Sequence, residues 1–364
     1  MESCELILTH EVPDSYSHLL FADRGDRVLT SVLLCAMEKS LDIKVEGVVS
    51  PRLLDGLNRL QTLWHEWRPK KYSLISISAD SYEEAPSNHQ GLGLFTFSGG
   101  VDSTYSVFHQ LSNEAIQPLP VGAAVFVHGA DIPLEDKAGF EAAKRRAEKI
   151  LEGTGIELIP VRTNSRLLGC NWEDSHGLEL SACLLLLQSG FGTGVLAGWR
   201  SAAEVVYPWG STPLTDPLAS TEAMRIVHDG LERNRIEKIE WLSRHPDVIR
   251  HLRVCWEGEN RGENCGACEK CVRTLLDFWA LGLPSPEAIP TRLSPELIRS
   301  IRPSDLDHIE EWKTLLSTAS ERLDRHDPNL KALRSVVRED IMRIRYRKFR
   351  RRLSGIIDDL LGRS

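Results

Sequence analysis

The sequence lacks an apolar run near the length of a membrane span, and it lacks a secretory leader. Its first residues, Met1 to Glu5, are acidic where such a leader would be basic. Low-complexity segments and internal repeats are also absent. These absences argue against membrane-spanning, exported and repeat proteins. We therefore expect a soluble protein that works in the cytoplasm and does not bind a membrane.

The sequence also has fewer basic residues (44 Lys and Arg) than acidic ones (52 Asp and Glu). The 364 residues carry a formal net charge of -8, which argues against nonspecific binding of nucleic acid by the whole surface. Hydrophobic residues make up 41% and charged residues 26%, as in a globular protein with a sizeable core. We divide the chain into an N-terminal α+β extension (1–90), a central domain (91–284) and a helical, basic C-terminal extension (285–364).

One stretch, Phe95-Thr-Phe-Ser-Gly-Gly-Val-Asp-Ser-Thr104, organises the chain. The apolar run that enters it predicts a buried strand, and a helical run follows the Ser-Gly-Gly turn. Such a corner grips phosphate, because glycines let the backbone approach and helix N–H groups point at the anion. Ser98 and Ser103 add hydroxyl donors, and Asp102 is suited to holding Mg²⁺ on the same phosphates. The alternative is an ordinary strand–turn–helix corner with a Ser or Asp cap.

Apolar strands alternate with helices from residue 92 onward. Besides the strand that precedes the glycine turn, the sequence predicts strands at 121–128, 157–161, 194–197 and 225–228. This alternation predicts an α/β fold, with a mostly parallel five-stranded sheet and helices on both faces. Ligands bind beyond the carboxyl ends of such strands. The segments expected at that edge are Ser98–Ser103, His128–Asp131, Thr163–Asn164 and Gly198–Arg200.

Two of these residues have simpler interpretations. A histidine at the end of a strand, such as His128, is often only capped or solvated. Asp131 lies where it would cap the helix that starts near Pro133.

The first 90 residues contain one clear helix. Ser50-Pro51 predicts its start, Pro69 ends it, and Trp64 and Trp67 lie on its apolar face. We interpret both tryptophans as core or interface anchors rather than a base-stacking platform. The polar segment 81–91 is the best linker candidate. Apolar stretches of strand or mixed character are 5–8, 27–36, 42–49 and 72–77.

A long connection spans residues 199–221. Loops of this length in a compact domain tend to be functional. Its side chains combine stacking surfaces with hydrogen-bonding groups, which suits a flat heterocycle with polar edges. They include Arg200, Glu204, Tyr207, Trp209, Ser211 and Asp216. The alternative is a structured surface loop built on turn-forming Pro and Gly.

Four of the eight cysteines lie within seventeen residues, with the spacing C-x9-C-x2-C-x2-C. They are Cys255, Cys265, Cys268 and Cys271. Four thiolates predict a closed tetrahedral zinc site, which leaves no open position for water and is therefore structural. An iron–sulfur cluster and four buried thiols are the alternatives. A reducing compartment favours a metal over disulfides.

The glycine stretch matches, at every fixed position, the SGGxDS signature of the PP-loop ATP pyrophosphatases, and it resembles that family. It is not a Walker A loop, because no Gly-Lys-Ser/Thr follows. In the family this loop holds the pyrophosphate end of ATP while a carboxylate, amide or carbonyl oxygen is adenylated, and a nitrogen or sulfur nucleophile then displaces AMP. The resemblance implies an adenine nucleotide alpha hydrolase-like fold that uses ATP and Mg²⁺. Asp102 and Ser103 would be catalytic. The ATP-binding residues would be Ser98, Gly99, Gly100, Val101, Asp102, Ser103, His128 and Gly198.

The glycine stretch and the cysteine cluster together resemble the 7-cyano-7-deazaguanine synthases of queuosine biosynthesis, over about residues 92–282. Trp256 follows the first cysteine as an aromatic does there, and Gly198 and Tyr207-Pro208 match a Gly and a Tyr-Pro of that family. The resemblance implies an ATP-dependent carbon–nitrogen ligase that forms AMP and binds Zn²⁺. It would adenylate a deazapurine carboxylate or amide for attack by ammonia or another amine. The substrate residues would be Arg200, Glu204, Tyr207 and Trp209.

The chain departs from that family in several places. Ala203 stands where the family has an acidic residue, with Glu204 next to it. Trp209 and Ser211 replace the Asp and Arg that follow Tyr-Pro. Both terminal extensions lack a counterpart in the compact synthases. The chain thus resembles a divergent relative, of the kind found in bacterial antiviral defence, where a deazaguanine is joined to another molecule. A protein or nucleic-acid acceptor and a homodimer both stay open.

The C-terminal extension ends in a strongly basic run, Arg343–Arg352, with Tyr346 and Phe349 interleaved. It predicts either binding to RNA, DNA or an acidic protein, or a solvated helix face. Two other functions stay open. One is a nucleotide-binding partner subunit without turnover. The other is sulfur or nitrogen transfer to tRNA, in which the basic run would hold the RNA.

Overall fold

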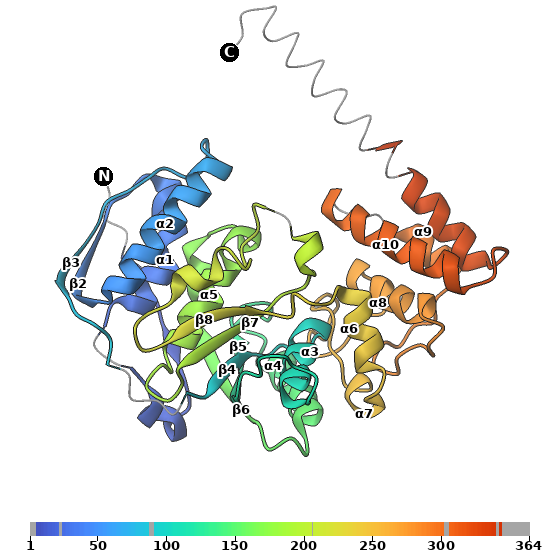
Figure 1. The fold of residues 1–364 in the computed structure, drawn as a ribbon, viewed down its shortest axis with the longest axis horizontal. Coiled ribbons are helices and arrows are strands. Elements are labelled where there is room, and N and C mark those ends of the chain that lie inside the picture. Colours follow the sequence, from blue (N-terminus) through green and yellow to red (C-terminus); the bar gives the residue numbers. More distant parts are fainter. Residues whose placement is uncertain are drawn as a thin grey trace, which may run out of the picture. The chain divides into compact units, whose positions relative to one another are not determined.

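The computed structural model describes residues 5–21, 24–86, 91–205, 207–301, 306–339 and 342–343 (Figure 1). The chain divides into two compact units, Met1–Glu263 and Asn264–Ser364. The basic run beyond Arg343 lies outside the described residues. Among the helices that are described, none has the length and apolar character needed to cross a membrane.

A six-stranded sheet forms the centre of the larger unit, in the order β1-β6-β5-β4-β7-β8. The five predicted strands are confirmed and run parallel, and β1 adds an antiparallel edge that the sequence did not predict. Two residues are too few to give a periodic signal. The strands are β1 (His10–Glu11), β4 (Gly93–Thr96), β5 (Val121–His128), β6 (Glu157–Thr163), β7 (Thr193–Ala197) and β8 (Arg225–Asp229).

Helices flank this sheet (Figure 1). Helices α3 and α5 both contact the central strands, α6 packs on α3, and α1 packs on α5. Since βαβ crossovers are right-handed, the reversal of strand order after β6 puts α5 on the face opposite α3 and α4. The helices are α1 (Asp26–Lys39), α2 (Pro51–Trp67), α3 (Val101–Leu111), α4 (Lys137–Leu151), α5 (Trp172–Leu185), α6 (Arg235–Leu242) and α7 (Pro246–Ile249). Short 3-10 turns are η1 (Asp14–Leu19), η2 (Ser165–Leu168), η3 (Ala202–Glu204) and η4 (Asp216–Ala219).

The N-terminal residues contain two differences from the sequence prediction. The stretch 27–36, expected to be strand or mixed, lies within α1, because its buried residues Leu29, Leu33 and Met37 recur every four positions. The strand expected at 72–77 instead runs as β3 (Ile77–Tyr82), parallel to β2 (Ile43–Val49) in a separate two-stranded sheet.

The residues before β3 are held by other partners. Ser73 N–H donates to the Met37 carbonyl over 3.0 Å, and Ile75 N–H donates to the Gln61 side chain over 2.9 Å. These bonds occupy the backbone that a strand would need. Helix α2 begins as predicted, because the Ser50 hydroxyl accepts from Leu53 N–H over 3.0 Å.

One hydrophobic core joins the N-terminal residues to the sheet. Leu33, Leu57 and Trp64, all fully buried, belong to the same cluster as Leu94 and Leu184. The core interpretation of Trp64 is therefore confirmed. Residues 1–90 are part of the larger compact unit, and the division between units falls at 263/264.

The smaller unit is helical. Helix α8 begins within the cysteine cluster, with Cys268 as its N-cap, and ends two residues before Gly282, and α10 packs on it. Arg273 of α8 forms an ion pair with Glu311, and Trp312 is fully buried. The helices are α8 (Glu269–Ala280), α9 (Pro295–Ser300) and α10 (Leu306–Arg322), and a further helical stretch covers 328–339.

Candidate functional site

The glycine turn lies where the strand order of the sheet reverses. Strand β4 pairs with β5 on one side and β7 on the other, and the chain leaves β4 through Ser98, Gly99 and Gly100 into α3. The crevice outside the carboxyl ends at such a reversal is the usual ligand site of a parallel α/β sheet. The structure therefore places this turn where a ligand is expected.

The turn presents the N-terminus of α3. Gly99 has a φ of 71°, in the left-handed region that favours glycine. Gly100 is the N-cap, and the first intrahelical bond runs from Thr104 N–H to its carbonyl over 3.0 Å. The N–H groups of Val101 to Ser103 thus precede the helical ladder and point out of the helix. This is the geometry of an anion site at a helix start.

Two hydroxyls lie inside the turn. The Ser103 oxygen accepts from Ser98 N–H over 3.2 Å and lies 3.2 Å from the Ser98 oxygen. Ser103 is buried, whereas Ser98 is exposed at the mouth of the turn. The pair fixes the turn and places one hydroxyl where a bound anion would meet it.

Asp102 lies between two cations of α6. Its Oδ2 accepts from Arg235 Nη1 over 3.2 Å, and its Oδ1 lies 3.7 Å from Lys238 Nζ. Oδ1 is buried and accepts no hydrogen bond. Because Gly100 is the N-cap and no side chain caps α3, the geometry does not support the interpretation of Asp102 as a cap.

Lys238 is fully buried and holds another part of the sheet edge. Its Nζ donates to the Gly198 carbonyl over 2.5 Å and lies 5.7 Å above the Tyr105 ring. Burial lowers the pKa of Lys238, and the neighbouring Asp102 carboxylate opposes that shift. No motif in the sequence points to Arg235 and Lys238, although their spacing of three puts both on one helix face.

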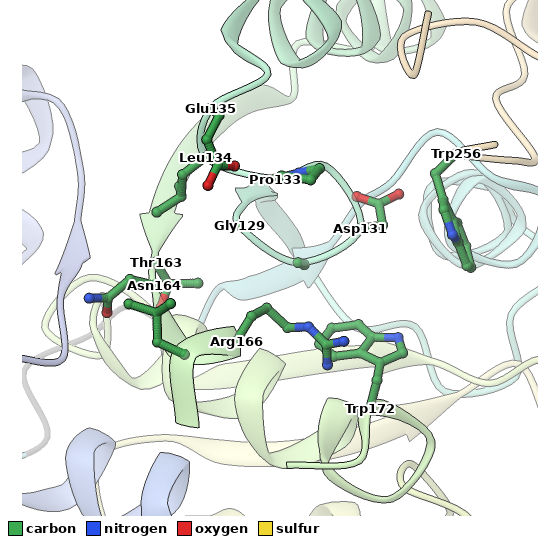
Figure 2. A pocket seen from close by; sticks show the side chains of 12 residues that line it. Gly129, Asp131, Pro133, Leu134, Glu135, Thr163, Asn164, Arg166, Trp172 and Trp256 are labelled. Atoms are coloured by element: carbon green, nitrogen blue, oxygen red, sulfur yellow. The ribbon is translucent and has the colours of Figure 1, made fainter. Parts of the chain in front are cut away.

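A cavity of about 410 Å³ opens beyond the carboxyl ends of β5 and β6 (Figure 2). Two of the segments expected at the sheet edge line it, joined by Trp172 at the start of α5 and by Trp256. The lining residues are Gly129, Ala130, Asp131, Pro133, Leu134, Glu135, Thr163, Asn164, Arg166, Leu167, Trp172 and Trp256. Its volume is that of a small-ligand site.

Arg253 links this cavity to the glycine turn. Its backbone N–H donates to the Gly99 carbonyl over 2.8 Å, and its Nη1 donates to Asp131 Oδ2 over 2.8 Å. The Arg253 side chain is only 3% exposed, so this bridge is fixed. The turn and the cavity are therefore neighbouring parts of one site. Arg253 could not be predicted from the sequence, because it lies in an irregular segment without a motif.

His128 and Gly198 have structural partners. His128 is buried, its Nε2 lies 2.9 Å from the Pro133 carbonyl, and its ring stacks on Phe140 at 4.2 Å. It does not line the cavity, and this geometry fits the simpler interpretation of a strand-end histidine. Gly198 N–H donates to the Asp229 carbonyl, while its own carbonyl receives Lys238.

The predicted substrate residues of the 199–221 connection lie apart from the large cavity. Arg200 is buried over the Trp199 ring and donates to the Glu204 carbonyl over 3.1 Å. The Glu204 side chain completes a capping box with Ser201. Both charged groups thus serve the fold of the connection.

The aromatic members of the connection pack on neighbouring elements. Tyr207 stacks on Trp67 of α2 with ring centres 5.4 Å apart, and it remains 42% exposed. Trp209 contacts Trp199 at 5.4 Å and His176 of α5 at 5.6 Å. A second cavity beside them, of about 10 Å³, is only large enough for a water molecule.

Two further residues of the connection form a buried network. Asp216 Oδ2 accepts from the Ser211 hydroxyl over 2.7 Å and lies 2.7 Å from His228 Nδ1. Asp216 and His228 are both almost fully buried. The network ties the connection to β8.

The four cysteines are brought together as predicted. The sulfur atoms of Cys255, Cys265, Cys268 and Cys271 all lie within 4.8 Å of one another. Tetrahedral zinc, with Zn–S bonds of about 2.3 Å, requires sulfur atoms roughly 3.8 Å apart. Backbone N–H groups of Gly266, Ala267 and Cys268 point at the sulfur atoms from 3.3–3.5 Å. The cluster is therefore able to hold a metal ion and is compatible with Zn²⁺.

Comparisons with protein-family models, with curated proteins and with solved structures give no match to this chain. The interpretation of the site therefore depends on the geometry described above and on the motifs in the sequence.

Proposed function

We propose that the chain is an ATP-dependent, AMP-forming carbon–nitrogen ligase with a PP-loop, related to the 7-cyano-7-deazaguanine synthases and with an adenine nucleotide alpha hydrolase-like fold. It adenylates a deazapurine carboxylate or amide, and ammonia or another amine then displaces AMP. One observation carries the proposal. The Ser98–Ser103 turn offers a helix N-terminus at the reversal of a parallel sheet, with two α6 cations beside it.

The charges around the turn suit a triphosphate. Lys238 and Arg235 pair with Asp102, and the Arg253 N–H donates to the Gly99 carbonyl of the turn. Phosphate oxygens would take over the two α6 cations, since they offer more negative charge than one carboxylate. The N–H groups of Val101–Ser103 and the Ser98 hydroxyl would bind the pyrophosphate portion. Held in this way, the leaving pyrophosphate is oriented and its charge is neutralised.

The residues present fit a magnesium ion. Asp102 Oδ1 is a buried carboxylate oxygen with no hydrogen bond, at the edge where phosphates would lie. Mg²⁺ bound there would neutralise charge on the phosphate oxygens. The cysteine cluster would hold structural Zn²⁺, because four thiolates leave no open coordination position. None of the seven described cysteines forms a disulfide, which supports a cytoplasmic setting.

The proposal is tested by incubating the protein with ATP, Mg²⁺, ammonia and 7-carboxy-7-deazaguanine and analysing the products by mass spectrometry. We expect AMP together with an amidated or cyano product. AMP without either product would indicate a different amine acceptor. ATP binding without AMP under any of these conditions would contradict the ligase and favour a nucleotide-binding partner subunit.

A further inference from the structure

Lys238 is a buried cation that faces the glycine turn from α6. Its side chain is 0% exposed, its Nζ donates to the Gly198 carbonyl over 2.5 Å, and Nζ lies 3.7 Å from Asp102 Oδ1. A Cβ atom on Gly230 would lie 3.3 Å from Nζ, so a larger residue there would crowd the amine. Lys238 thus contacts both the first turn of α3 and the carboxyl edge of the sheet.

The surroundings of the amine favour its charged form. Burial lowers the pKa of Lys238, and the Arg235 guanidinium contributes to that shift. Three carboxylates oppose it, those of Asp102, Glu232 and Asp229. A carbonyl oxygen and carboxylates suit an ammonium group, which has three N–H donors and no acceptor.

Of these three carboxylates, Asp102 depends most on Lys238. Asp229 and Glu232 accept hydrogen bonds from side chains of α3. By contrast, Asp102 Oδ1 accepts no hydrogen bond, and Oδ2 accepts only from Arg235, over 3.2 Å. The Asp102 carboxylate is therefore balanced by two cations of α6, both within 4 Å.

Two cations beside a carboxylate oppose a divalent metal at the same oxygen. Mg²⁺ needs the negative charge of Asp102, but it would lie close to two positive charges whose repulsion is weakly screened at a buried site. A polyphosphate reverses this balance, because its oxygens attract both cations and add several negative charges. Asp102 is then available to a metal ion.

We infer that Lys238 is a positioning residue that keeps Asp102 from binding a divalent cation until a polyphosphate occupies the glycine turn. The identity of that polyphosphate as ATP rests on the proposed function. The inference adds an order of binding, in which the Asp102 carboxylate becomes a metal ligand only after the phosphates have engaged Lys238 and Arg235.

Binding of Mn²⁺ without nucleotide tests the inference apart from turnover. Mn²⁺ takes the same oxygen ligands as Mg²⁺, and electron paramagnetic resonance measures its free concentration during titration of the full chain. The variants are Asp102→Asn, Lys238→Met, and Lys238→Met combined with Asp102→Asn. Lys238→Gln, which keeps an N–H donor for the Gly198 carbonyl, is a second neutral variant. The melting temperature shows which variants are folded.

Lys144→Met is the matched control. Lys144 also pairs with a carboxylate, that of Glu148 over 3.0 Å, but on the solvent-facing side of α4. Its replacement removes a lysine charge beside a carboxylate without touching the glycine turn.

We expect the wild type, Asp102→Asn and Lys144→Met to bind Mn²⁺ alike. Both neutral Lys238 variants should bind it about tenfold more tightly or better, and Asp102→Asn should abolish that gain. ATP without added metal, measured by isothermal titration calorimetry, should bind the Lys238 variants about tenfold more weakly, since one cation near the phosphates is lost. A purely structural role for Lys238 would instead weaken both ligands.

The inference is overturned if the wild type binds Mn²⁺ more tightly than Asp102→Asn, a comparison that needs no Lys238 variant. It is also overturned if folded Lys238 variants gain no affinity for Mn²⁺. A gain in these variants, with no AMP formed by the wild type, would leave the inference standing and remove the ligase. AMP formation by a wild type that binds Mn²⁺ through Asp102 without nucleotide would do the reverse.

Discussion

A carboxylate in the first turn of α3 lies close to two positively charged side chains of α6. The Asp102 carboxylate lies within 4 Å of both Arg235 and Lys238, and Lys238 is fully buried. A capping aspartate would not need two cations, and Asp102 is not the N-cap. A buried lysine is normally costly unless a partner or a ligand keeps it charged. We therefore expect the function of the turn to depend on Asp102, Arg235 and Lys238.

Asp102→Asn should lower AMP formation by about two orders of magnitude or more, the scale of losing one electrostatic group in a preorganised site. A neutral amide oxygen is a weaker Mg²⁺ ligand than a carboxylate. The rate is measured from AMP release at saturating ATP, alongside the melting temperature.

The matched control for this change is Asp136→Asn. Asp136 does cap its helix, accepting from Gly139 N–H over 2.9 Å, and asparagine is an equally good cap. We expect the control to keep its AMP rate and melting temperature. Near-normal AMP release from Asp102→Asn would remove the magnesium role.

His10 in strand β1 is another buried titratable group. His10 is 8% exposed, and burial lowers its pKa to about 4, with Arg27 contributing. Since protonation then favours the unfolded chain, stability is complete above pH 6.5 and is lost as the pH falls toward 4. The free energy of unfolding should fall by about 2 kcal/mol from this residue between pH 7 and pH 5.

Urea unfolding of the wild type, His10→Gln and His18→Gln at pH 7 and pH 5 measures this loss. His18 is exposed in η1, so its replacement should leave the acid loss intact. His10→Gln should reduce the loss by about 2 kcal/mol. An identical acid loss in all three proteins would show that His10 does not stay neutral in the fold.

The cysteine cluster should bind one zinc ion per chain and support the fold around it. Cys268→Ser should remove the metal and lower the melting temperature by roughly 6 °C or more, because structural zinc binding is coupled to folding. Metal content by atomic emission and thermal unfolding provide the measurements. Cys170→Ser, outside the cluster, is the control. Metal-free protein with an unchanged melting temperature would contradict a zinc site.

The elements that the sequence predicted well are those with a strong local signal. Five apolar runs became the parallel strands, and the Ser50-Pro51 cap marked the start of α2. The two-residue strand β1 has no local signal, because its partner Thr163 lies far along the chain. The apolar run in α1 was ambiguous, since short apolar segments fit a strand or a buried helix.

The sequence predicts the phosphate-binding glycine turn, but it predicts only part of the cavity beside that turn. The glycine turn is recognisable because its residues are consecutive. The cavity is not, since Arg166, Trp172 and Trp256 become neighbours only through the ends of β6, the start of α5 and the cysteine segment. Arg200 and Glu204 have side chains that could bind a substrate, but in the structure they form hydrogen bonds within the 199–221 connection itself.

At the scale of the whole molecule, residues 1–90 complete the fold of the larger unit. Helices α1 and α2 share one hydrophobic core with the sheet, and β1 forms an edge of that sheet. We therefore do not expect residues 91–364 to fold alone. Asp174 of α5 adds a buried ion cluster, accepting from Arg68, Lys71 and the Tyr72 hydroxyl at 2.7–2.9 Å. Removing its partners would leave an unpaired buried carboxylate.

A chain that begins at residue 91 should therefore be insoluble or unfold without a cooperative transition. The full chain, prepared in the same way, is the control. Solubility and thermal unfolding followed by circular dichroism give the comparison. A soluble 91–364 protein with a cooperative transition would show that the N-terminal extension is an independent domain.

The central claim is that the glycine turn holds the pyrophosphate end of ATP and that the bond between the α and β phosphates is broken. Phosphorus NMR of ATP, Mg²⁺, ammonia and 7-carboxy-7-deazaguanine with the full chain tests it most directly. The account predicts equal amounts of AMP and pyrophosphate, which depend on the deazaguanine and are lost in Asp102→Asn. Formation of ADP and phosphate, or unchanged ATP, would contradict it.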